Sequence, residues 1–97
     1  MEHVMKRIHY RVGLPGWKVA ARVGLPLSFR AYVHRDSEAK MFWAVSPDID
    51  GLTVEGATLD EVIREVSSAA DVLIELQLGK STPAEPIVSF DGALSAA

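Results

Sequence analysis

Four carboxylates near the middle of the sequence could do chemistry together. Asp48 and Asp50 are two residues apart in a segment rich in turn-forming residues, and two more acids, Asp60 and Glu61, follow shortly after. Clustered carboxylates can hold divalent cations, as in metal-dependent nucleases. A simpler explanation is that Asp favours turns and that acidic residues favour the first turn of a helix. We therefore expect structural roles for all four, with no bound metal.

Other catalytic patterns are missing from the sequence. His3, His9 and His34 lie far apart, and none belongs to a set of several ligands at regular offsets. Ser46 lacks the Gly-x-Ser-x-Gly context of a nucleophile. The sequence has no phosphate-binding glycine loop, no dinucleotide fingerprint and no cysteine. It therefore predicts a protein that is not an enzyme, has no catalytic residue and uses no cofactor.

Three short segments have the pattern of β-strands. Leu27–Arg35 alternates apolar with polar residues, and Met41–Ser46 is a compact apolar and aromatic run. The turn-forming segment 47–51 separates this run from a third alternating segment, Leu52–Glu55. The short connections predict an antiparallel meander.

A long amphipathic helix is predicted to follow. Thr58 and Glu61 match a capping box, in which the Thr58 hydroxyl accepts from the Glu61 N–H and the Glu61 carboxylate accepts from the Thr58 N–H. Gly79 suits the residue after the last turn. Apolar residues recur between these positions at steps of three and four, which predicts one buried face: Leu59, Val62, Ile63, Val66, Ala69, Ala70, Leu73 and Ile74.

The flanking segments are less regular. The alternation of apolar and polar residues near Lys6–Val12 is compatible with a strand or with a loose basic arm. Pro15 and Gly24 mark the limits of a predicted short helix in which Trp17 packs inward. Beyond Gly79 we expect a linker and a frayed tail, with Ile87–Phe90 as a further strand on its own sheet or on that of a neighbouring subunit.

These elements predict an α+β fold, a three-stranded antiparallel meander with one long helix packed on one face. The chain length allows one domain. We divide it into an N-terminal extension with a short helix (1–26), a core (27–79), and a linker with the extra strand and tail (80–97).

The core carries a family resemblance. The segments SPDIDGL, TVEG and ATLDEVIREV follow one another directly, from Ser46 to Val66. This order resembles the HicB-like antitoxin family, whose pattern is a strand ending in Pro-Asp-x-x-Gly, a short strand with Gly, and a Thr-Leu-Glu/Asp-Glu helix start. The resemblance covers roughly residues 28–78 and implies a partial ribonuclease H-like fold without nuclease activity. The matching residues are Pro47, Asp48, Gly51, Gly56, Thr58, Leu59, Asp60 and Glu61.

Charge is distributed unevenly along the chain, whose net charge is −3. Most of the lysines and arginines precede residue 36, whereas nearly all of the acids follow it. The asymmetry can arise from two solvated faces of one fold, from contact with charged partners, or from head-to-tail self-contact.

Nucleic-acid and membrane partners are not expected. The long helix begins with Asp60 and Glu61 where a double-stranded RNA-binding domain would need cations. The segment after Gly79 is too short and too poor in basic residues for a DNA-binding module, which leaves the basic N-terminal arm as the remaining candidate for DNA contact. No apolar run reaches the length of a membrane span, and no signal-peptide core is evident, so we expect a cytoplasmic protein.

The resemblance implies an antitoxin that neutralises a small basic RNA-cleaving toxin of the HicA type by protein–protein contact. We expect Asp48, Asp50 and Glu55, with Phe42 or Trp43 depending on register, to contact this partner. A homodimer or higher homo-oligomer is expected because an uncovered sheet face favours pairing. The alternatives are an orphan self-associating module without a toxin partner and a residual metal-dependent nuclease.

Overall fold

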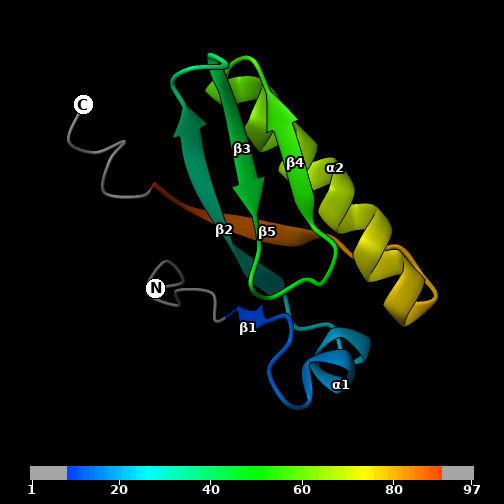
Figure 1. Ribbon diagram of the computed structural model, residues 1–97. Helices are drawn as coiled ribbons and strands as arrows, with labels where there is room; N and C mark the ends of the chain where they lie inside the picture. Colours follow the sequence, from blue (N-terminus) through cyan, green and yellow to red (C-terminus); the bar gives the residue numbers. More distant parts are fainter. Residues whose placement is uncertain (1–8, 91–97) are drawn as a thin grey trace, which may run out of the picture.

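The computed structural model describes residues 9–90 and places a long helix across one face of a five-stranded sheet (Figure 1). The elements follow one another along the chain as β1 (Tyr10–Arg11), α1 (Trp17–Arg22), β2 (Leu27–Asp36), β3 (Met41–Val45), β4 (Thr53–Gly56), α2 (Leu59–Leu78) and β5 (Ala84–Phe90). The α+β class and the long helix packed on the sheet are therefore as predicted.

Strand β2 is the centre of the sheet. It pairs antiparallel with β3, which pairs antiparallel with β4, so the predicted meander is present. Leu27 has partners in both β1 and β5, and Tyr32 has partners in both β3 and β5. Because a strand has only two edges, β1 and β3 must lie along one edge of β2 and β5 along the other.

The sheet is mixed, whereas the sequence predicted an antiparallel meander with the status of any extra strand left open. Both β1 and β5 run parallel to β2. Helix α2 connects β4 to β5, which supplies the long crossover that a parallel strand needs. The extra strand thus belongs to the chain's own sheet, and it begins at Ala84, before the predicted Ile87.

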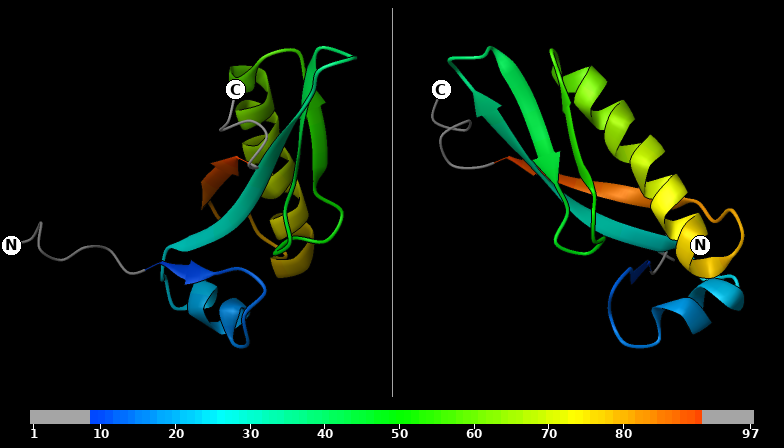
Figure 2. Two further views of the ribbon diagram at one scale, coloured as in Figure 1. Left: turned by 60° about the vertical axis from the view of Figure 1, so that its left-hand side comes forward. Right: turned by 45° about the vertical axis from the view of Figure 1, so that its right-hand side comes forward.

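The N-terminal elements lie at one end of the sheet. The predicted strand near Lys6–Val12 is reduced to β1, and its first residues lie outside the described part of the chain. Helix α1 occupies the predicted interval between Pro15 and Gly24, and Trp17 packs inward as expected. Figure 2 shows α1 beside the C-terminal end of α2 in both views.

The core lies between α2 and the sheet. The apolar face of α2 is buried at Val62, Val66, Ala70, Ile74 and Leu78. Opposite it, alternate residues of β2 and one residue of β3 have no exposed surface: Phe29, Ala31, Val33 and Ala44. The predicted helical period therefore identifies the buried face of α2, and burial of this apolar area is the main stabilising contribution.

The two ends of α2 are capped. At the N-terminus, the Glu61 N–H donates to Thr58 Oγ1 at 3.1 Å, as the capping box predicts. The Glu61 carboxylate accepts from the Ala57 N–H at 2.8 Å, one residue earlier than the predicted Thr58 N–H. At the C-terminus, Gly79 has the left-handed conformation (φ 82°), and its N–H donates to the Glu75 carbonyl. The sequence therefore located both ends of the helix.

Gly56 of β4 packs closely against the first turn of α2. A Cβ at Gly56 would lie 2.9 Å from Glu61 Cβ, which is fixed to the helix backbone and cannot swing away. We predict that Gly56→Ala lowers the free energy of unfolding by roughly 1–3 kcal/mol through overpacking. Urea denaturation measures this, with the exposed neighbour Glu55→Ala as the control. An unchanged midpoint for Gly56→Ala would show that this contact is not tight.

Candidate functional site

Asp48 fills a gap on one edge of β2. Strand β1 ends opposite Ser28 and β3 begins its pairing at Tyr32, so Arg30 has no strand partner on that edge. The Asp48 carboxylate takes this place, with Oδ2 accepting from the Arg30 backbone N–H at 2.7 Å. The side chain of a loop residue thus satisfies a backbone donor that would otherwise lie unpaired inside the sheet.

The Arg30 side chain returns to the same carboxylate. Its Nη2 lies 2.7 Å from Asp48 Oδ1, and its Nε lies 3.1 Å from Oδ2. Arg11 Nε lies 3.9 Å from Oδ1, and the Asp48 side chain is only 4% exposed. Asp48 therefore connects β1, β2 and the β3–β4 loop through one buried carboxylate.

Local geometry brings Asp48 to this position. Its own N–H donates to Ser46 Oγ at 3.1 Å, which closes the turn after β3. Gly13, at φ 94°, lets the loop after β1 approach so closely that a Cβ there would lie 3.1 Å from the Asp48 carbonyl oxygen. The Pro-Asp-x-x-Gly turn is thus fixed by the Ser46 hydroxyl within the β3–β4 loop and by close packing against the loop after β1.

The charge state of Asp48 follows from these contacts. Burial of the carboxyl group acts to raise its pKa, but the hydrogen bonds from the Arg30 side chain and backbone, with the charges of Arg30 and Arg11, outweigh burial and lower the pKa below its ordinary value of 3.8. The same ion pair raises the pKa of Arg30. Asp48 is accordingly an ionised structural group at neutral pH.

The four carboxylates singled out in the sequence do not converge. Asp48 is buried against Arg30, Asp50 is exposed in the β3–β4 loop, and Asp60 is exposed in the first turn of α2. Glu61 caps that helix. Among residues 9–90, no three His, Cys, Asp or Glu side chains form a group that could hold a metal ion.

The sheet face opposite α2 presents an aromatic pair. The register places Trp43 between His34 on β2 and Glu55 on β4. The Trp43 and His34 rings are stacked, with centroids 4.2 Å apart, and Trp43 is still 38% exposed. The register thus decides between the two aromatic candidates, because Phe42 faces α2 and packs against the core.

The rest of this face, which we call the open face, is mixed in character. Figure 1 views it from the front, with α2 behind β3 and β4. Since cross-strand partners share a face, Tyr32, Val45, Thr53 and Glu55 lie on the same side as Trp43, and Ile87 of β5 lies level with Arg30. Ile87 is 51% exposed. An exposed aromatic and an exposed aliphatic side chain surrounded by polar groups are typical of a protein-contact surface.

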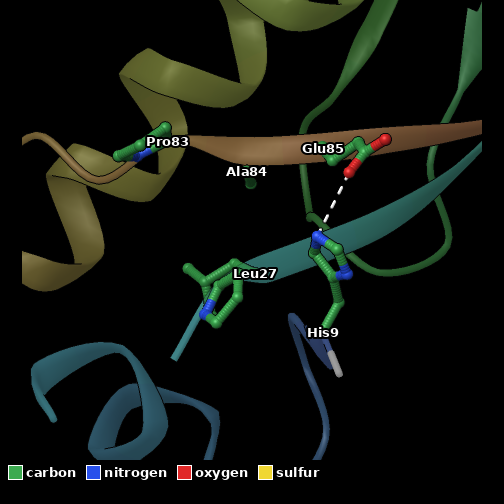
Figure 3. A pocket seen from close by; sticks show the side chains of 6 residues that line it. His9, Leu27, Pro83, Ala84 and Glu85 are labelled. Atoms are coloured by element: carbon green, nitrogen blue, oxygen red, sulfur yellow. Dashed lines mark ion pairs between the residues drawn. The ribbon is translucent and has the colours of Figure 1, made fainter. Parts of the chain in front are cut away.

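A small pocket of about 290 Å³ lies where β1, β2 and β5 begin. Its lining includes Leu27 and Ala84, and across its rim His9 Nε2 lies 3.1 Å from Glu85 Oε1 (Figure 3). The remaining lining residues are Pro26 and Pro83. A single histidine–glutamate pair at the rim of an otherwise apolar hollow does not provide the convergent polar groups of a catalytic site.

The sequence interpretation missed three residues that shape these sites. His34 was considered only as a metal ligand or general base, and Arg30 only as one of the polar residues of the alternating segment Leu27–Arg35, although the alternation places both on one face. Glu85 lies far from His9 in the chain, and no local pattern signals their contact. All three depend on strand register, which a single sequence does not determine.

In comparisons with known proteins, no protein-family model, curated protein or solved structure matches this chain. In the part of the chain that the structure describes, neither helix is long and apolar enough to cross a membrane.

Asp48 makes stability depend on pH. Because its folded-state pKa is lowered, its contribution is complete above the unfolded pKa near 3.8 and is lost as the pH falls through the lower folded value. We predict that Asp48→Asn lowers the free energy of unfolding at pH 7 by roughly 1.5–3 kcal/mol. The difference from wild type should shrink below pH 4. Urea denaturation at pH 7 and below pH 4 measures this difference in the free energy of unfolding, with Asp50→Asn as the control. Equal loss at both pH values would contradict the ion-pair explanation.

Proposed function

We propose that this protein is a HicB-like antitoxin that binds and neutralises a small basic RNA-cleaving toxin through protein–protein contact. The observation that carries the proposal is the ordered set SPDIDGL, TVEG and ATLDEVIREV. The fold supports it, because these segments form the β3–β4 connection, β4 and the start of α2, and the meander-plus-helix arrangement is the one the resemblance implies.

The open face is the proposed toxin-binding surface. Trp43 is a large exposed anchor, and Glu55 lies beside it in register. Tryptophan is enriched among the residues that dominate binding energy, and a neighbouring carboxylate favours a basic partner. Asp50 can add a charge at the end of the sheet, whereas Phe42 and Asp48 are engaged internally.

The basic residues near the N-terminus give little support to DNA binding. Arg30 and Arg11 both face Asp48, so part of the positive charge in the first third of the chain is neutralised within the fold. The proposal therefore includes no DNA contact by the described residues.

Co-expression with the product of the adjacent reading frame tests the proposed function. We expect a short basic protein to co-purify with this chain, and its RNA cleavage to stop on binding. Trp43→Ala should weaken the complex by about tenfold or more, since it removes the central anchor. Leu14→Ala, another exposed apolar residue, is the control. Stable folding of both proteins with no complex would contradict the proposal.

The alternative is an orphan self-associating module without a toxin partner. Exposed apolar side chains on both helices favour some self-contact: Val19, Val72 and Leu76 are more than half exposed. Failure to bind any neighbouring gene product, together with concentration-dependent association of the chain alone, would favour this second function.

A further inference from the structure

Two helix surfaces away from the open face have matching patterns and opposite charge. On α1 and its C-cap residue Val23, Lys18 and Arg22 each precede an apolar residue, Val19 and Val23 respectively. On α2, Asp71 and Glu75 precede Val72 and Leu76 at the same spacing. We call the first four residues the basic ridge and the second four the acidic ridge.

The apolar members of both ridges are unusually exposed. Val19 and Val23 are 63% and 71% exposed, and Val72 and Leu76 are 58% and 76% exposed. Residues four apart lie next to each other on a helix. Each ridge therefore presents two adjacent apolar side chains with two like charges beside them. The two ridges therefore do not pack against each other within the monomer.

We propose that the chain forms a two-fold dimer in which the basic ridge of each copy packs antiparallel on the acidic ridge of the other. The occupant of each ridge is thus a second copy of this chain. The proposal goes beyond the antitoxin function and does not depend on it, because no ridge residue belongs to the open face.

The charge pattern selects the antiparallel orientation. On both ridges each charged residue comes directly before an apolar one. The charges therefore lie on the same side of the apolar pair in both ridges, when each helix is viewed from its N-terminus. Antiparallel packing brings equivalent flanks of two helices together, whereas parallel packing separates them. In the dimer Lys18 then faces Glu75, and Arg22 faces Asp71. The four charges have no ion-pair partner among residues 9–90, so they are available for this contact.

The position of the ridges permits the contact to be made twice. Both views of Figure 2 place α1 near the C-terminal end of α2, at one end of the molecule. A two-fold axis near this end sets each basic ridge against the partner's acidic ridge, which doubles the buried apolar area and satisfies the charges of both copies.

Charge reversal with mixing tests the proposed pairing in the full chain. The variant K18E/R22E has two acidic ridges, and D71K/E75K has two basic ridges. By sedimentation velocity over a concentration series, we expect wild type to dimerise and each variant alone to dimerise about tenfold or more weakly, because like charges oppose each other. An equimolar mixture of the two variants should recover the dimer.

Two further samples separate ridge pairing from general effects. E38K/E65K makes the same change in net charge as D71K/E75K at exposed positions outside the ridges, and it should dimerise like wild type. Lys18 Nζ lies 6.0 Å from the Trp17 ring centroid, so the single pair R22E and D71K repeats the mixing test without disturbing that contact. Circular dichroism verifies that all variants are folded.

The outcomes are decisive. Recovery of the dimer only in the mixture supports the pairing. A monomeric wild type, a double variant that dimerises like wild type, or a mixture that stays monomeric would overturn it. Growth of wild type into species larger than a dimer would overturn the closed two-fold arrangement.

Discussion

The fold depends on one carboxylate that replaces a strand. On one edge of the central strand, between the end of β1 and the end of β3, a backbone donor has no strand partner, and Asp48 accepts from it. An unpaired buried N–H costs free energy comparable to a lost hydrogen bond, and an unpaired buried carboxylate costs more. The Arg30 N–H and the Asp48 carboxylate satisfy each other by a hydrogen bond, and the Arg30 guanidinium neutralises the charge of the carboxylate. Three separate parts of the chain therefore meet at one point.

This arrangement explains why an acidic turn motif need not indicate catalysis. Asp48, whose pKa is lowered by its contacts, holds parts of the sheet together, and its acidic neighbours are exposed or cap a helix. An aromatic pair lies on the open face, and apolar ridges with opposite charges lie on the two helices. The two features lie on different elements, so the proposed toxin contact and the proposed dimer contact use different surfaces.

Local patterns were sufficient to predict the meander, the limits of α2 and its buried face, because these depend on turn chemistry, capping and the helical period. The parallel pairing of β1 and β5 was not predictable, because it depends on contacts between residues far apart in sequence. The same holds for the candidate site. Trp43 and Glu55 could be named from composition and turns, but only the register separates Trp43 from Phe42 and places His34 beside it. Arg30 as the partner of Asp48 carried no local signal, since the two lie on different elements.

Hydrogen exchange at the Arg30 amide tests most directly whether Asp48 replaces a strand. We expect this amide to be as protected as that of its neighbour Ala31 in β2, and we expect Asp48→Ala to remove the protection at Arg30 while Ala31 stays protected. The amide of Asp50, in the exposed loop, provides the unprotected reference. If the Arg30 amide exchanged in wild type as fast as that of Asp50, the carboxylate would not be its partner and the central claim would be wrong.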